Sequence, residues 1–169
     1  MAHRGRLSVL ANLMQKPYEE MFAEFDPSYM VRSEGRSGDV KYHMGYETSV
    51  DYQGRALDLI LCANPSHLES VDPVALGRAR ALQDKLEEGK QNNVCPILVH
   101  GDASIAGQGI VYETMQMLKL KGYTTQGTLH IVVNNQVGFT ATVQETQSMH
   151  YTTDLAKAFS APVFHVNAE

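Results

Sequence analysis

The sequence predicts an α/β fold with a mainly parallel sheet flanked by helices. One stretch, residues 96–140, reads as strand, glycine-rich loop, helix, strand and turn, and such units almost always cross over to give parallel strands. Strand-like and helix-like patterns also alternate about three times after a helical lead-in. We therefore expect one α/β domain over residues 1–169. Residues 1–95 supply the lead-in, first strand and first helix, and residues 141–169 supply a loop, a helix and a strand.

Composition is that of an ordinary globular domain. The chain has 169 residues, of which 43% are hydrophobic and 20% are charged. Its net charge of −5 and the absence of a basic run argue against a nucleic-acid partner. No apolar run approaches the length of a membrane span. Both ends of the sequence lie close to structured patterns, so we expect an internal piece of a larger protein.

Two short helices are expected first. Apolar residues at helical spacing follow a basic motif, HRGR at residues 3–6, and Pro17 ends this helix. A second helix is expected over residues 18–25. The basic motif is either a solvated cluster or an anion-recognition site, where arginine binds phosphate or carboxylate oxygens beside a helix N-terminus.

A polar loop, a strand and a helix follow. Residues 26–47 read as a loop that contains His43, Gln53-Gly54 reads as a turn, and residues 56–63 read as a strand. A turn at Asn64-Pro65 ends that strand.

The next helix is expected to hold Pro73 in its first turn, where proline is tolerated, and to run to about Leu86. Ser66 and Glu69 have the spacing of a capping box, which predicts that they cap this helix.

The central unit carries the chemistry. Pro96–Val99 is a strand candidate that stops before Gly101-Asp102, and Leu129–Val133 is a second one that stops before Asn134-Asn135. Between them we expect a glycine-rich loop with Gly101, Gly107 and Gly109, then a helix over residues 110–120. Beyond them we expect a polar loop over residues 140–151, a helix over 154–161 and a strand over 162–166.

Asp102 and Asn135 each follow a strand end, and ligands of parallel sheets bind beyond the carboxyl ends of the strands. Carboxylate, amide and turn-carbonyl oxygens suit magnesium or calcium, whereas zinc prefers cysteine and histidine. Magnesium completes its coordination with water and phosphate oxygens. The pattern therefore predicts a magnesium–diphosphate site, with ordinary turn residues as the alternative. The loop lacks the GxGxxG and GKS/GKT motifs of other phosphate sites.

Six motifs in order give a more specific indication. They are HRGR, GDVKYHMG, NPSHLE, HGDASIAGQGIVYET, HIVVNNQVGF and APVFHVNAE, and they are distributed between residues 3 and 169. In this the sequence resembles the E1 components of 2-oxoglutarate dehydrogenases, which are thiamine-diphosphate-dependent 2-oxo acid dehydrogenases. The resemblance implies the thiamine diphosphate-binding fold and its diphosphate-binding domain. It also implies oxidative decarboxylation of 2-oxoglutarate, with transfer of the succinyl group to the lipoyl group of E2, in the tricarboxylic acid cycle.

The resemblance also implies roles for individual residues. The implied magnesium ligands are Asp102, Asn135 and the carbonyl of Val137. The implied cofactor contacts are Arg4, Ser66, Leu68, Asp102, Ala103, Ser104 and Asn135. The implied catalytic and substrate-binding histidines are His3 and His43, with Ser66 also touching the substrate. His67 and His100 lie inside the motifs without an implied role.

The implied partners are a second copy of the full-length chain, as a homodimer, and the lipoyl domain of E2. A glutamate from another domain would activate the cofactor, so this chain alone should be inactive. The expected compartment is the mitochondrial matrix in a eukaryote and the cytoplasm in a bacterium. A paralogue acting on 2-oxoadipate and a non-catalytic α/β binding module are the alternatives.

The sequence departs from the family pattern at three places. QSMHYTTD at residues 147–154 lacks an arginine that is usual there, Ser104 replaces a common alanine, and Glu47 replaces a small polar residue.

Overall fold

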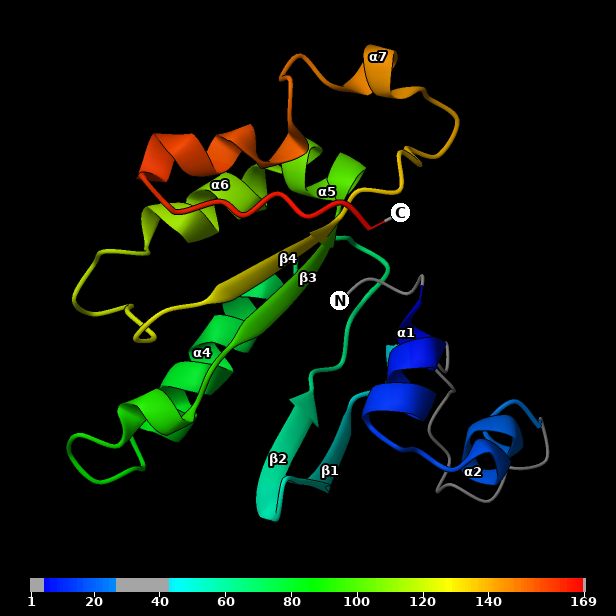
Figure 1. Ribbon diagram of the computed structural model, residues 1–169, viewed down its shortest axis with the longest axis vertical. Coiled ribbons are helices and arrows are strands. Elements are labelled where there is room, and N and C mark those ends of the chain that lie inside the picture. The colour runs from blue at the N-terminus through cyan, green and yellow to red at the C-terminus, as the bar shows by residue number, and fades with distance from the viewer. Residues whose placement is uncertain (1–4, 27–42, 169) are drawn as a thin grey trace. The chain divides into compact units, whose positions relative to one another are not determined.

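The computed structural model describes residues 5–26 and 43–168, and these fall into two compact units, one within residues 1–67 and one within residues 68–169 (Figure 1). The fold is mixed α/β, with one antiparallel and one parallel strand pair. None of the helices in the described ranges combines the length and the apolarity that a bilayer crossing needs.

The first unit begins with helices close to the expected positions. Helix α1 (Arg6–Ser8) continues into a π-helical segment, η1 (Val9–Leu13), and α2 spans Tyr18–Ala23. Gly5 precedes α1 with a φ of 78°, a conformation that glycine adopts without the steric cost of a side chain. The π-helical segment was not expected, because a wider turn leaves nearly the same apolar pattern as an α-helix.

A β-hairpin completes the first unit. Strand β1 (Tyr46–Tyr52) pairs antiparallel with β2 (Arg55–Leu61). The predicted turn is confirmed: Gln53 and Gly54 have φ values of 53° and 77°, and two positive φ values fit the tight turns that join antiparallel strands. The expected strand at residues 56–63 is present as β2. Its expected place in a mainly parallel sheet is wrong, because the two-residue turn pairs it with its neighbour.

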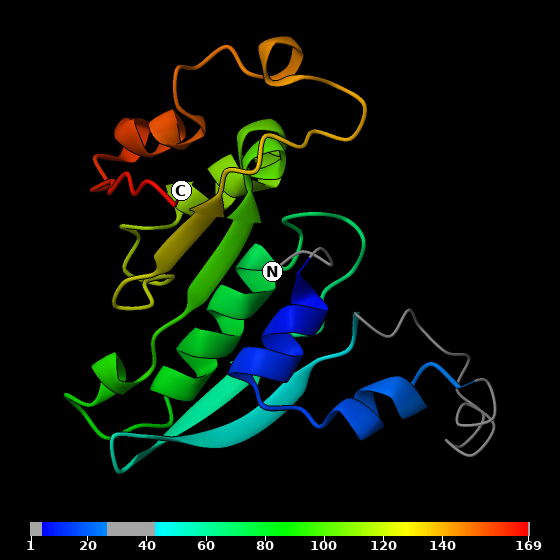
Figure 2. The same cartoon turned by 45° about the vertical axis from the view of Figure 1, so that its right-hand side comes forward.

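The second unit contains the expected strand–helix–strand arrangement. It comprises α4 (Asp72–Gln83), η3 (Gln91–Asn93), β3 (Ile97–Gly101), α5 (Asp102–Gly107), α6 (Gly109–Gln116) and β4 (Leu129–Val133). Strands β3 and β4 are parallel, with Ile97 opposite Leu129 and Gly101 opposite Val133, so the parallel pairing is confirmed. Helix α4 runs alongside these strands in both views (Figures 1 and 2).

Two expectations about this unit are wrong. The glycine-rich loop is mostly helix α5, because Ala103 and Ala106 favour helix and Asp102 is favourable in a first turn. Extended backbone at Gln108 separates α5 from α6. The capping box at Ser66 and Glu69 is also wrong, since α4 begins only at Asp72.

The C-terminal part departs from expectation in two further places. A short helix, α7 (Val143–Thr146), interrupts the expected loop and is capped by Thr142 and Glu145. The expected helix that follows is present as a 3₁₀ helix, η4 (Thr152–Phe159). Residues 162–166 are not a strand: they pair with no strand in the described part of the chain, and Phe164 and Val166 are exposed.

A small core holds the second unit together. Ile105, Val111 and Met115 are buried, and partly buried apolar side chains pack on them from β4 and η4, namely Val132, Leu155, Ala156 and Phe159. Alternate β4 residues Leu129, Ile131 and Val133, with Ile97 of β3, remain exposed. One face of the parallel pair is thus open, although parallel sheets are usually covered on both faces.

Candidate functional site

The structure places two of the predicted metal ligands at one edge of the parallel pair. Asp102 is the first residue of α5 and directly follows β3. Asn135 comes two residues after β4. Because Gly101 is paired with Val133, both follow the same end of the two strands. Asp102 is buried, and Asn135 is exposed.

The loop after β4 brings Asn135 and Val137 together. The side-chain Oδ1 of Asn135 accepts a hydrogen bond from the main-chain N–H of Val137 at 3.1 Å. This loop also packs on the first turn of α5, since a Cβ added to Gly138 would lie 3.6 Å from the Cβ of Ala103. Three predicted metal ligands are therefore held by two segments in contact.

The donor set fits a magnesium ion. The Oδ1 atom of Asp102 is buried and accepts no hydrogen bond from any residue that the structure describes. An unsatisfied buried carboxylate oxygen is costly, and a bound cation would satisfy it. Thr152 Oγ1 donates to the main-chain carbonyl of Asp102 at 2.7 Å and so fixes the backbone at this point. Carboxylate, amide and carbonyl oxygens are the ligands that magnesium prefers.

Ser104, a predicted cofactor contact, faces a carboxylate of the protein. Its Oγ donates to Oε1 of Glu69 and also lies 3.1 Å from the carbonyl oxygen of Gly101. Both Ser104 and Glu69 are buried. The side chain of Ser104 therefore anchors the first turn of α5 to the segment before α4. Ala103, the neighbouring predicted contact, is half-buried.

Glu69 continues into a chain of buried polar groups. Its Oε2 lies 2.6 Å from Nδ1 of His100, and Nε2 of His100 lies 3.0 Å from Nδ1 of His130. The two imidazole rings are stacked, with centroids 5.2 Å apart. Asp72 Oδ2 lies 3.8 Å from Nδ1 of His100. This polar chain links the start of α4 to both strands of the parallel pair.

The environment separates the protonation states of these groups. Burial would raise the pKa of Glu69, but hydrogen bonds from His100 and Ser104 outweigh it and hold that pKa below its ordinary value. Burial, together with a hydrogen bond to Glu69 and its charge, raises the pKa of Asp72 to about 8. Burial, helped by the charge of His100, lowers the pKa of His130 to about 4. At neutral pH Glu69 is thus ionised, Asp72 holds a proton and His130 is neutral.

These groups offer another possible cation site. One ligand atom each from Glu69, Asp72 and His100 lie within 4.8 Å of one another. In the structure the two carboxylate oxygens of Glu69 already have protein partners, His100 on Oε2 and Ser104 on Oε1.

The predicted substrate residues of the first unit also meet. His43 is buried, and its Nε2 lies 2.9 Å from Oγ of Ser66. A hollow of about 470 Å³ is lined by these two residues and by Ala63, Asn64, Pro65 and His67. The main-chain N–H of Asn64 donates to the carbonyl of His43 at 2.9 Å, which ties the end of the hairpin to His43.

The remaining predicted residues are placed differently. His3 and Arg4 lie outside the described residues, and Leu68 is half-buried in the second unit. Within the basic motif, both expectations are wrong for Arg6, which is neither solvated nor available to an anion. Its fully buried guanidinium donates to the carbonyls of Met44 at 2.8 Å and Cys62 at 2.6 Å.

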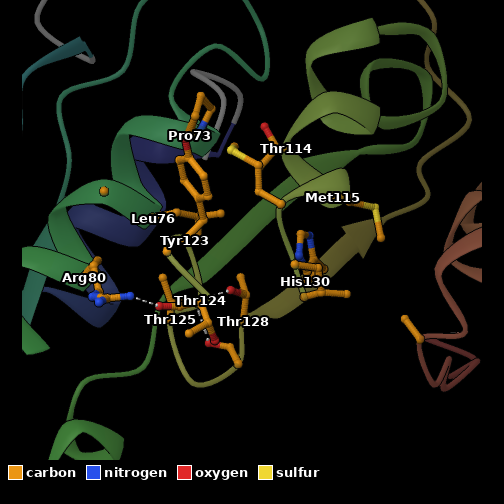
Figure 3. Close-up of a pocket in the computed structure, with 16 residues that line it drawn as sticks. Pro73, Leu76, Arg80, Thr114, Met115, Tyr123, Thr124, Thr125, Thr128 and His130 are labelled. Carbon is orange, nitrogen blue, oxygen red and sulfur yellow. Dashed lines mark hydrogen bonds between the residues drawn. The ribbon is translucent and has the colours of Figure 1, made fainter. Parts of the chain in front are cut away.

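A second hollow of about 470 Å³ lies between α4, α6 and the loop before β4 (Figure 3). Its lining is mostly apolar and includes Leu76, Met115, Tyr123 and His130. Arg80 at its rim donates to the carbonyl of Thr124 at 3.0 Å. None of the three predicted metal ligands lines this hollow, so it is separate from the strand-end site.

Sequence reasoning missed the polar chain. Asp72 and His130 were not considered, and Glu69 was interpreted as a helix cap. One signal was available: His100 directly follows one expected strand, and His130 lies inside the other, otherwise apolar strand expected to be its neighbour. Their partner Glu69 is 31 residues from His100, and no local pattern indicates that contact.

Comparison with known proteins identifies the relatives of this sequence. The dehydrogenase E1 component family matches residues 1–169. The chain is 51% identical to "2-oxoglutarate dehydrogenase-like, mitochondrial" of Rattus norvegicus, over 100% of this chain and 17% of the relative. It is 52% identical to "2-oxoglutarate dehydrogenase E1/E2 component" of Corynebacterium glutamicum, over 100% of this chain and 14% of the relative. It is 51% identical to "2-oxoglutarate dehydrogenase, mitochondrial" of Saccharomyces cerevisiae, over 99% and 17%. The chain thus spans about a sixth of the length of such relatives.

Proposed function

The chain belongs to the dehydrogenase E1 component family, and on that premise we propose that it forms part of the E1 component of a 2-oxoglutarate dehydrogenase complex. The relatives named for 2-oxoglutarate dehydrogenase support this, since about half of the residues are identical over essentially the whole chain. The reaction would be thiamine-diphosphate-dependent oxidative decarboxylation of 2-oxoglutarate. The succinyl group would pass to the lipoyl group of E2, in the tricarboxylic acid cycle.

One observation carries the cofactor assignment. The buried, unsatisfied Oδ1 of Asp102 lies at the same strand edge as the Asn135–Val137 turn. We assign Asp102, Asn135 and the carbonyl of Val137 to magnesium. Residues 102–104, at the start of α5, would lie against the diphosphate within a thiamine diphosphate-binding fold. When bound, thiamine diphosphate supplies the carbon nucleophile and the electron sink for decarboxylation.

The residues of the chain would bind and orient. The Asp102 carboxylate would offer negative charge to the cation, and its burial would strengthen that interaction because water does not screen it. In the first unit, His43 and Ser66 offer an imidazole and a hydroxyl at the same hollow. Both can donate hydrogen bonds to a substrate carboxylate. His3 and Arg4 would join them as substrate and cofactor contacts.

A larger assembly is part of the proposal. The exposed apolar face of the β3–β4 pair is expected to pack against other segments, and a longer E1 chain would provide them. The glutamate that activates the cofactor would come from another domain, which is consistent with a homodimer of full-length chains. Size measurement that found an active monomer would contradict the homodimer.

The product of E1 would pass to the lipoyl domain of E2. Mitochondrial and bacterial relatives are both found, so the compartment would be the matrix or the cytoplasm accordingly.

A substrate assay tests the proposal. The full-length protein that carries this chain should turn over 2-oxoglutarate faster than 2-oxoadipate when supplied with magnesium and thiamine diphosphate. Preference for 2-oxoadipate would identify the longer-substrate paralogue. Absence of turnover with both, together with no binding of thiamine diphosphate, would identify a non-catalytic module.

A further inference from the structure

We propose that Glu69 is a positioning residue for the magnesium site, and the inference rests on the proposed function. Glu69 contacts His100 and Ser104, which lie two residues before and two residues after Asp102. It therefore braces both sides of the turn that presents the Asp102 carboxylate. Glu69 acts through these neighbours and is not assigned as a ligand of the metal.

Each oxygen of the Glu69 carboxylate has its own partner. Oε2 lies 2.6 Å from Nδ1 of His100, the last but one residue of β3. Oε1 accepts from Oγ of Ser104 in the first turn of α5. Hydrogen bonds to an ionised acceptor are stronger than neutral ones. The carboxylate thus fixes the angle at which the chain passes from the strand into the helix.

The backbone of Glu69 indicates that its place is tightly determined. Its φ of 70° lies in the left-handed region, which residues with a Cβ rarely adopt. Its carbonyl accepts a hydrogen bond from the N–H of Asp72 at 3.0 Å, just before α4 begins. Such conformations persist only where the surrounding structure imposes them, and they are frequent at functional sites. Glu69 is also only 7% exposed, as expected for a side chain that the surrounding structure holds in place.

Titration calorimetry on the full-length protein tests the proposal. Thiamine diphosphate is titrated at a series of magnesium concentrations, and the half-saturating magnesium concentration is measured for each variant. We expect Glu69→Gln to raise that concentration about 10- to 100-fold, the usual cost of losing a group that orients a ligand. Glu113→Gln is the matched control, because Glu113 is an exposed glutamate of α6, and it should leave the value unchanged.

A double-mutant cycle separates positioning from general stability. Ser104→Ala alone should also raise the half-saturating concentration. In the double variant, Ser104→Ala should raise the half-saturating magnesium concentration of Glu69→Gln by less than about threefold, because both changes remove the same contact. Melting temperatures are measured without metal or cofactor. A lower melting temperature for Glu69→Gln with an unchanged magnesium requirement would overturn the proposal.

Two further outcomes are distinguishable. If Glu69→Gln does not fold, Ser104→Ala carries the test, since it removes one hydroxyl, and an unchanged magnesium requirement in that variant overturns the proposal. If the wild-type protein binds no thiamine diphosphate in magnesium, the proposed function itself fails, and the inference fails with it.

Discussion

The side-chain oxygen of Asn135 accepts a hydrogen bond from the main-chain N–H of Val137 at 3.1 Å. Two residues expected to bind the same ion are therefore held in one turn by a hydrogen bond of the protein itself. Gln136 between them has a φ of 59°, so the turn is a specific conformation and not an extended continuation of β4. Preorganised ligands lose less conformational entropy when they bind.

Replacement of Asn135 should weaken cofactor binding for two reasons: it removes an expected metal ligand, and it removes the hydrogen bond that holds the turn. We expect Asn135→Ala to lower magnesium-dependent affinity for thiamine diphosphate by at least about tenfold, measured by calorimetry. Asn92→Ala, at an exposed asparagine of η3, is the control and should bind normally. Equal affinity in the two variants would contradict the role of Asn135.

The contact between Gly138 and α5 predicts a packing effect. A Cβ at Gly138 would lie 3.3 Å from the carbonyl oxygen of Ala141 and 3.6 Å from the Cβ of Ala103. We expect Gly138→Ala to lower the free energy of unfolding by about 1 kcal/mol and to weaken cofactor binding. Gly122→Ala meets no atom within 4 Å and should change neither quantity. Denaturant unfolding gives the comparison, and equal stabilities would argue against this packing.

The hydrogen bond between His43 and Ser66 predicts a substrate effect. If these side chains bind the distal carboxylate, His43→Ala should reduce kcat/KM more for 2-oxoglutarate than for a shorter monocarboxylic 2-oxo acid. The loss of one hydrogen bond to a charged group corresponds to roughly tenfold or more. Steady-state kinetics with both substrates measures the ratio. Equal losses would speak against a distal-carboxylate role.

The raised pKa of Asp72 predicts a pH dependence of stability. The folded protein holds this proton up to about pH 8, whereas the unfolded chain releases it near its ordinary value of about 4. The contribution of this proton to the free energy of unfolding is complete below about pH 4 and is lost as the pH rises to 8. Asp72→Asn does not titrate, so its melting temperature minus that of the wild type should increase from pH 4 to pH 8. A flat difference for Asp72→Asn over this pH range would refute the assignment.

The parts of the fold that could be predicted are those that local pattern determines. Strands β3 and β4 are apolar runs with polar ends, and the Gln53-Gly54 turn has the residues its conformation requires. Strand β1 was missed because YETSVDY is largely polar and its strand pairing is supplied by β2. Ser66 and Glu69 were misinterpreted because a capping box depends on spacing alone.

Contacts distant in sequence could not be predicted. Glu69 meets His100 and Ser104 across 31 and 35 residues, and Arg6 meets Cys62 across 56. Such pairs depend on how the elements pack within each unit, which sequence periodicity does not encode. The common edge of Asp102 and Asn135 was predictable, because Asp102 directly follows β3 and Asn135 comes two residues after β4. Their role as metal ligands stays a prediction.

The proposal depends above all on the unsatisfied carboxylate oxygen of Asp102. Its most direct test is calorimetric titration of thiamine diphosphate into the full-length protein, with and without magnesium, for the wild type and Asp102→Asn. Asparagine keeps the size of the side chain and removes its charge. We predict magnesium-dependent binding in the wild type and its loss in the variant. Unchanged magnesium-dependent affinity in Asp102→Asn would contradict the assignment of this strand edge as the cofactor site.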